Sequence, residues 1–187
     1  LLAQEEYFKG RVHVVDNHRI SVTQAQSVLD AVELTRQGFT GAQIKEILET
    51  EAMDATIYIA VDTLEYLKKG GRITAAAAAI GTVLNLKPVL TIQGDKLDAY
   101  TKTRGMKSAF KALDKDLSGR LSALHTQGLL KAGIAYTQMD PDTLEFFKEE
   151  MKKRYPDLEL FQLPLTMSIG CHTGPGALGI GLVRVHK

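Results

Sequence analysis

The residues best suited to chemistry in this chain lie in one glycine-rich stretch, Gly170-Cys171-His172-Thr173-Gly174-Pro175-Gly176-Ala177-Leu178-Gly179-Ile180-Gly181. Glycine at this density indicates that the backbone approaches another group closely, or that several φ angles are positive. An imidazole beside such a turn can donate a hydrogen bond to an anionic oxygen. The stretch therefore predicts an anion site at His172. A histidine satisfied by backbone carbonyls in a tight turn is an equally good interpretation of the same residues.

A second candidate for chemistry is the segment Gly70-Gly71-Arg72. Its guanidinium follows two flexible residues, an arrangement suited to gripping a carboxylate or a phosphate. The simpler interpretation is that the glycines end one helix and that Arg72 is a solvated residue before the next. Composition alone favours this simpler interpretation.

Several other chemistries find little support in the sequence. The glycine string lacks the Gly-Lys-Ser/Thr ending of a phosphate-binding P-loop, and an apolar strand rather than a helix follows it. The histidines show no metal-ligand spacing, and there is no Cys-x-x-Cys motif. Cys171 has no evident activating base, so we expect a small buried thiol. Asp16, Asp54 and Asp62 follow or precede predicted strands, where aspartate most often caps a turn.

The overall composition is that of a globular protein with a real core. The chain has 187 residues, of which 44% are hydrophobic and 24% charged, and its formal net charge is +1. This balance gives no electrostatic footprint of a nucleic-acid or membrane-surface binder. The single cysteine excludes an internal disulfide framework and fits a reducing compartment. No apolar run approaches the roughly 20 residues that span a bilayer.

Hydrophobic periodicity predicts alternating strands and helices that must position these residues. We expect strands at 11–16, 55–61, 87–92, 97–101, 132–136, 158–163 and 182–185, and helices at 21–38, 40–52, 64–68, 75–84, 104–125 and 141–151. The first helix should bury an apolar face that contains Ala25, Val28, Leu29, Val32 and Leu34. Such alternation predicts α/β layers with largely parallel pairing, together with one antiparallel hairpin that turns at Gly94-Asp95.

Three segments taken together resemble the DegV family of fatty-acid-binding proteins. They are residues 62–73 (DTLEYLKKGGRI), residues 84–90 (LNLKPVL) and residues 172–179 (HTGPGALG), in the order and spacing of that family. The segment Val14-Val15-Asp16-Asn17 is similar to an earlier family strand and turn, although serine is more usual at the last position. The resemblance covers essentially the whole chain. Members of the family are generally longer and begin with an α/β segment that carries a Thr-Ser-Gln-Pro-Ser loop, which is absent here. We therefore interpret this chain as a C-terminal portion.

The resemblance implies a two-domain α/β fold with mixed, largely parallel sheets, N-terminally incomplete. Residues 1–55 would be the remainder of the first domain and residues 56–187 the second, with the 170–181 loop at the ligand site between them. It implies an apolar tunnel for a long-chain fatty acid, whose carboxylate would contact His172, Thr173 and Gly174. The residues that would shape the loop are Gly170, Pro175, Gly176 and Ala177. Those that would lie at the interdomain mouth or tunnel are Gly71, Arg72, Ile73, Ile80 and Leu84.

The same resemblance implies a binding protein of the bacterial cytoplasm that is not itself an enzyme. It would present its fatty acid to a partner fatty acid kinase, and it would need no other cofactor and no metal. Nucleic acid and integral membrane association are not expected. One alternative is a phosphotransferase or hydrolase on a related α/β scaffold that uses His172. Another is an interaction fragment that docks through Arg72 and the neighbouring lysines.

Overall fold

The computed structural model of the chain describes residues 2, 5–79, 86–92, 96–125 and 128–186. Within these ranges the helices are α1 (Ser21–Arg36), α2 (Gly41–Thr50), α3 (Glu65–Lys69), α4 (Ala75–Ala78), α5 (Met106–His125), α6 (Pro141–Arg154) and α7 (Met167–Thr173). The strands are β1 (Ala55–Ala60), β2 (Leu86–Ile92), β3 (Leu97–Arg104), β4 (Leu130–Tyr136), β5 (Glu159–Pro164) and β6 (Leu178–Arg184).

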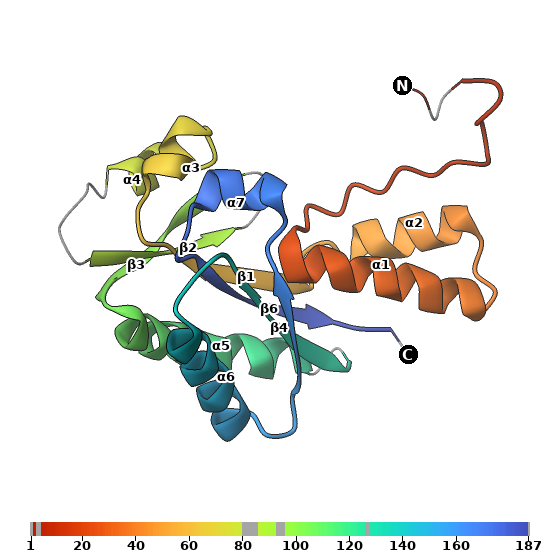
Figure 1. Ribbon diagram of the computed structural model, residues 1–187. Helices are drawn as coiled ribbons and strands as arrows, with labels where there is room; N and C mark the ends of the chain where they lie inside the picture. The colour runs from red at the N-terminus through yellow and green to blue at the C-terminus, as the bar shows by residue number, and fades with distance from the viewer. Residues whose placement is uncertain (1, 3–4, 80–85, 93–95, 126–127, 187) are drawn as a thin grey trace.

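The strands form one mixed sheet in the order β3-β2-β1-β6-β4-β5 (Figure 1). The prediction of a mixed α/β fold is confirmed, but the prediction of largely parallel pairing is wrong. Among the described pairs only β4 and β5 run parallel, because α6 forms a crossover between them. Strands β2 and β3 pair antiparallel, as the predicted hairpin requires, while its predicted turn at Gly94-Asp95 lies outside the described residues. Strand β6 inserts antiparallel to both β1 and β4. Alternation along the sequence therefore does not determine the strand directions here.

One face of the sheet is covered by α5 and α6, which lie together below it in Figure 1. The main core lies in this layer. Phe110 of α5 and Phe147 of α6 are almost fully buried, and their rings meet edge to face with centroids 5.3 Å apart. Tyr58 of β1 and Ile180 of β6 project into the same cluster from the sheet. Asp140 caps α6, since its carboxylate accepts a hydrogen bond from the backbone N–H of Thr143.

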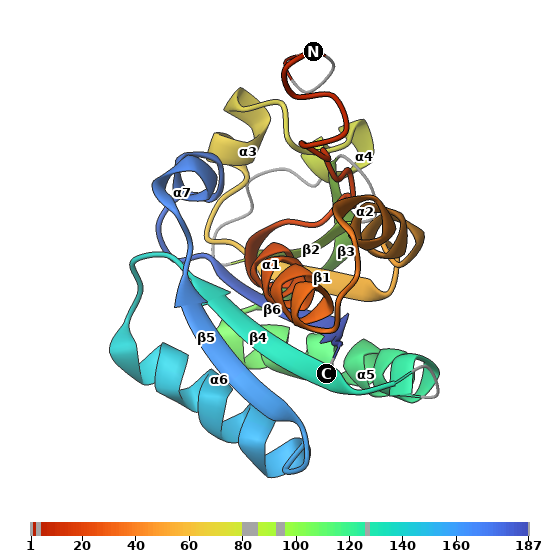
Figure 2. The ribbon, with the colours of Figure 1, turned by 90° about the vertical axis from the view of Figure 1, so that its right-hand side faces the viewer.

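The opposite face carries two separate groups of helices (Figures 1 and 2). At one end α3 and α4 pack on β1 and β2 through a small cluster that includes Leu64, Leu67 and Leu90. At the other end the α1–α2 hairpin lies over β1, β6 and β4. The hairpin has a cluster of its own, built around Leu34, Ile44 and Leu48. A capping box at Thr40 begins α2, at the start of the predicted helix at 40–52.

The predicted apolar face of α1 is right for Leu34, which is buried, but wrong for its central residues. Val28, Leu29 and Val32 are 55%, 57% and 45% exposed. The buried side of the helix is instead largely polar, formed by Val22, Thr23, Gln26, Ser27, Asp30 and Leu34. Small and polar side chains can face the sheet here because the strands beneath present glycines and because Gln26 donates a hydrogen bond to the buried carboxylate of Asp30 at 2.9 Å.

Two other segments differ from their predictions. Residues 12–20 form neither helix nor strand, and Val12 and Val14 are 45% and 65% exposed, so the predicted buried strand at 11–16 is wrong. The segment has strand-like residues but pairs with no strand in the described ranges; the backbone N–H of Asp16 donates instead to the Glu49 carboxylate. The described part of the predicted helix at 75–84 is the short α4, and its remainder falls largely in residues 80–85, outside the described ranges.

Candidate functional site

The predicted loop at residues 170–181 is wrong as a single loop, because it consists of three different structures. His172 lies in the last turn of α7. Residues 174–177 form a tight turn in which Gly174 and Gly176 have φ angles of 75° and 73°. From Leu178 onward the chain is the central strand β6, whose glycines lie in the sheet. The positive φ values explain glycine in the turn, while the strand glycines have a different cause, described below.

The turn is fastened to the end of β4. The hydroxyl of Thr137 donates to the carbonyl of Gly174 at 2.9 Å and accepts from the backbone N–H of Ala177 at 2.9 Å. The backbone N–H of Gly176 donates to the carbonyl of Gln138 at 2.8 Å. One threonine side chain therefore bridges both ends of the turn, which holds the end of α7 in a defined position.

Helix α3 brings the two glycine motifs of the sequence into contact beside α7 (Figures 1 and 2). The ring of Tyr66 lies against Gly174, where a Cβ atom would be 2.5 Å from the ring. Gly70 faces the imidazole of His172, and a Cβ atom there would be 2.2 Å from Nδ1. Glycine at 70 and 174 permits this close packing, and an alanine at 70 would displace the His172 ring from where it lies.

The predicted site residues of this region lie in one compact unit. His172 is half-buried, and within the described part of the chain its ring makes no hydrogen bond; the Nδ1 edge of the ring packs against Gly70. Thr173 is buried, and its hydroxyl donates to the Ile169 carbonyl at 3.3 Å. Gly170 lies inside α7, Pro175 is exposed at the turn, and Ala177 is fully buried.

The segment around Arg72 is held by backbone contacts to the start of β3. Gly71 has a φ angle of 64°, and the carbonyl of Arg72 accepts from the N–H of Leu97 at 3.0 Å. Ile73 is 8% exposed and forms an isolated bridge to Leu97. The Arg72 side chain is exposed and makes no hydrogen bond or ion pair within the described residues. The other two predicted mouth or tunnel residues, Ile80 and Leu84, lie outside the described residues.

An apolar pocket opens on this face of the sheet, between the start of α1 and α7. Its floor is formed by the sheet and its walls by the two helices; the lining includes Ile20, Ser21, Val22, Ile57, Ile59, Ile92, Leu97, Ala135, Leu165, Ile169, Thr173 and Gly179. Apart from Ser21 and Thr173 these are aliphatic residues or glycine. Thr173 brings the pocket to the end of α7; His172, the residue before it, is not among the lining residues, and its ring packs against Gly70.

The strand glycines create the shape of this floor. Gly133 of β4 pairs with Gly181 of β6, and Val22 of α1 occupies the hollow above both. A Cβ atom at either glycine would lie 2.6 Å from Val22. Paired glycines therefore let the first turn of α1 approach the sheet closely, where it closes one end of the pocket.

Sequence reasoning missed Tyr66, Thr137, Gly133 and Val22, and it missed the contact of Gly70 with His172. Gly133 interrupts a predicted strand, which is a signal of close backbone approach. Thr137 directly follows a predicted strand and so lies at a sheet end. The contacts of Tyr66 and Gly70 with α7 are tertiary, and no local pattern announces them.

Other candidate groups take ordinary structural roles. Asp62 forms an ion pair with Lys87 at 2.5 Å beside Gly176, and Asp54 pairs with Arg184 at 3.1 Å. Cys171 is exposed, so the prediction of a buried thiol is wrong; it lies on the outer side of α7. Among the described residues no group of His, Cys, Asp and Glu could hold a metal ion. None of the described helices is both long and apolar enough to cross a membrane.

The fold and the pocket place the chain among mixed α/β proteins that keep an apolar pocket on one face of the sheet. A family model described as "Uncharacterised protein, DegV family" matches residues 1–185. The chain belongs to the DegV family. A DegV domain-containing protein of Deinococcus radiodurans is 34% identical over 182 residues, which are 97% of this chain and 63% of that protein. Protein DegV of Bacillus subtilis is 30% identical and is covered over 59% of its length.

Solved structures give the same result. A fatty-acid-binding DegV family protein from Thermus thermophilus superimposes with a TM-score of 0.84 at 32% identity, covering 96% of this chain and 63% of that one. A stearic acid-binding protein from Eubacterium ventriosum has a TM-score of 0.83 at 23% identity, which supports the shared fold. The chain thus spans a little under two thirds of the relatives that it matches.

Proposed function

We propose that this protein binds a long-chain fatty acid, with the acyl chain in the apolar pocket and the carboxylate at the end of α7. The observation that supports this most directly is that the apolar pocket extends to Thr173 at the end of α7, next in sequence to His172, whose ring makes no hydrogen bond within the described residues. The solved DegV family protein from Thermus thermophilus, 32% identical, is described as binding fatty acid.

The physical chemistry of the two parts matches such a ligand. Each buried methylene contributes about 0.8 kcal/mol. The pocket has a volume of about 60 Å³ in this structure, so it takes in only a few methylenes as it stands, and it would have to widen to hold a long acyl chain. A carboxylate cannot be buried without hydrogen-bond donors. In this proposal His172 donates to it, and the turn at Gly174, Pro175, Gly176 and Ala177 shapes the space around it. The buried Thr173 hydroxyl would have to leave the Ile169 carbonyl in order to contribute.

The experiment is a direct search for the ligand. The purified protein is extracted with organic solvent and the extract analysed by mass spectrometry, and the delipidated protein is then offered palmitate and oleate. We expect a co-purified fatty acid, or tight uptake of at least one added acid, and weaker uptake by His172→Ala. No extracted lipid and no uptake of either acid would refute the proposal.

We further propose that the protein presents the carboxylate to a partner fatty acid kinase in the cytoplasm. Arg72 supports this, since its exposed side chain is free among the described residues and lies just beyond Gly70, which contacts His172. Residues 1–55 would belong to a first domain and residues 56–187 to a second. If the kinase docks here, Arg72→Glu should abolish phosphorylation of the bound acid and leave fatty acid uptake unchanged. A change in uptake would place Arg72 in the pocket instead.

Hydrolysis or phosphotransfer by His172 is the less favoured function. A histidine that acts as a base is usually oriented by a carboxylate. Within the described residues His172 has no such partner.

A further inference from the structure

The chain enters α1 through a strained segment, residues 17–22. His18 and Ser21 have φ angles of 52° and 58°, and they are the non-glycine residues with positive φ in the described part of the chain. A side chain in this conformation is unfavourable because its Cβ atom crowds a carbonyl oxygen. Such residues persist where surrounding contacts impose the conformation, and they concentrate at switches and ligand clamps.

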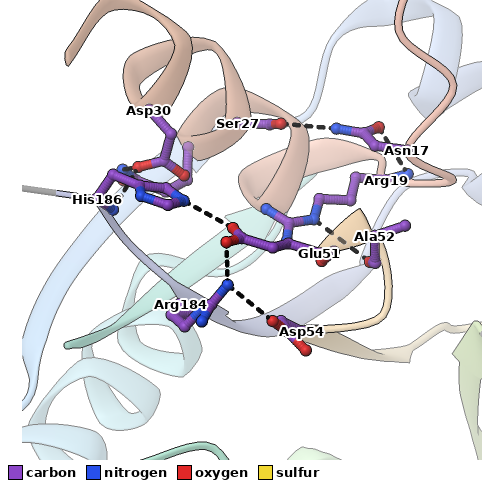
Figure 3. Close-up of polar contacts among 10 residues, drawn as sticks. Asn17, Arg19, Ser27, Asp30, Glu51, Ala52, Asp54, Arg184 and His186 are labelled. Carbon is purple, nitrogen blue, oxygen red and sulfur yellow. Dashed lines mark hydrogen bonds and ion pairs between the residues drawn. The ribbon is translucent and has the colours of Figure 1, made fainter. Parts of the chain in front are cut away.

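Arg19, between the two strained residues in sequence, ties this segment to the rest of the fold, and Figure 3 shows its contacts. Its guanidinium donates to the carbonyl of Glu51 at 2.6 Å and to that of Ala52 at 3.5 Å. Its backbone N–H donates to the side chain of Asn17 at 3.2 Å, and Asn17 donates in turn to the hydroxyl of Ser27 at 2.6 Å. Arg19 thereby fastens the entry of α1 to the end of α2.

The segment that accepts the Arg19 hydrogen bonds, just after α2, is itself anchored to the sheet. The carboxylate of Glu51 is paired with Arg184, the last residue of β6, and is 2.7 Å from Nε2 of His186. The backbone N–H of His186 donates to Asp30 of α1 at 3.0 Å. The ion cluster in Figure 3 therefore links Arg19, through the end of α2, to the central strand.

The strained segment leads directly into one wall of the apolar pocket. Ile20, at its mouth, is 39% exposed, and Val22 closes the pocket over the glycine hollow. The apolar cluster of the α1–α2 hairpin is separate from the two clusters of the sheet, and α1 faces the sheet largely with polar side chains. The wall can therefore move without breaking either main core.

We propose that residues 17–22 are a gate on the apolar pocket. The hydrogen bonds of Arg19 hold this gate closed, although the backbone at His18 and Ser21 is strained in the closed state. Release of Arg19 from the two carbonyls lets His18 and Ser21 relax, and this moves Ile20 and Val22 away from the pocket so that a linear acyl chain can enter or leave. The identity of the ligand rests on the proposed function; the opening of the segment does not.

The test compares Arg19→Met with Ser21→Gly, and uses Arg36→Met as a matched control. Methionine keeps much of the arginine stem but removes the donors, whereas glycine adopts positive φ without strain. Arg36 pairs with Glu33 on the surface, and its side chain is 74% exposed. Two readouts are taken: hydrogen exchange at residues 17–22 in protein without lipid, and the dissociation rate of cis-parinaric acid, a fluorescent 18-carbon fatty acid.

We expect Arg19→Met to accelerate both by about tenfold, because hydrogen bonds from a charged group are lost. Ser21→Gly should slow both by roughly threefold, and the control should change neither. Equal hydrogen-exchange rates at residues 17–22 in Arg19→Met and Arg36→Met would overturn the gate. It would also be overturned if Arg19→Met and Ser21→Gly changed the exchange rate in the same direction. If parinaric acid does not bind the unmodified protein, the proposed function fails, and hydrogen exchange alone still decides whether the gate exists.

Discussion

Replacement of Gly70 by alanine tests whether the position of His172 matters for binding. The backbone at Gly70 has φ −78° and ψ −6°, which alanine adopts without strain. The new Cβ atom would lie 2.2 Å from Nδ1 and 2.9 Å from Cε1 of His172, so the imidazole has to rotate away. The nearest other atom is the Tyr66 carbonyl oxygen at 3.3 Å, a contact that a small shift relieves.

The expected effect is large on binding and small on stability. A hydrogen bond to a charged carboxylate contributes about 1.5–3 kcal/mol, so its loss raises the dissociation constant roughly 10- to 100-fold. The free energy of unfolding should change by no more than about 1 kcal/mol. Only the His172 ring has to move, and alanine has a higher helix propensity than glycine.

The assay is calorimetric titration with myristic acid and with 1-tetradecanol, which share an acyl chain and differ in the polar end. Gly119→Ala serves as the control, since Gly119 lies on α5 with no atom within 4 Å of its missing Cβ. We expect Gly70→Ala to weaken the acid and spare the alcohol, and to have no further effect in a His172→Ala background. Equal losses for acid and alcohol, or unchanged affinity for both, would refute the reasoning.

Two further predictions concern stability. Gly181→Ala should destabilise the protein by roughly 1–3 kcal/mol, because its Cβ would lie 2.6 Å from Val22. Addition of Val22→Ala should recover part of that loss. Val22→Ala alone costs roughly 2 kcal/mol because it leaves a cavity. If the losses of the two substitutions, measured by urea denaturation, are strictly additive, the packing described here is contradicted. Hydrogen bonds from the Thr143 hydroxyl and backbone lower the pKa of Asp140. A lowered pKa contributes stability above the ordinary aspartate value of about 4 and loses it as the pH falls through the folded-state value. The stability difference between the protein and Asp140→Asn should therefore shrink as the pH falls below about 4, and a constant difference would contradict this assignment.

The sequence predicted most elements because their periodicity is strong. The buried strand β1 and the long amphipathic α5 are examples. The failures came where tertiary context outweighs pattern. The hydrophobic stripe of α1 predicted burial of Val28 and Leu29, yet α1 turns a polar side to the sheet because Gly133 and Gly181 leave room for it.

The residues of the candidate site could be singled out from the sequence, but their arrangement could not. His172 and the turn that follows it could be singled out from residue types, because an imidazole beside a glycine-rich turn can donate a hydrogen bond to an anionic oxygen. A glycine can be needed for different structural reasons, however, and the sequence does not distinguish them. Gly174 adopts a positive φ angle, whereas Gly181 leaves room for Val22 of the helix that packs on the sheet. The partners Tyr66 and Thr137 come from distant segments, which no local pattern brings together.

The position of β6 has a consequence for synthesis and folding. Among the described strand pairs, the half-sheet β3-β2-β1 meets the half-sheet β4-β5 only through β6, which pairs with both. Each half can form while the chain is still on the ribosome, but neither can be joined to the other until residues 178–184 have emerged. Pairing over such a sequence separation is slow and leaves apolar strand edges uncovered in the meantime. The nascent protein should therefore depend on chaperones, and loss of these few residues should prevent assembly of the whole sheet.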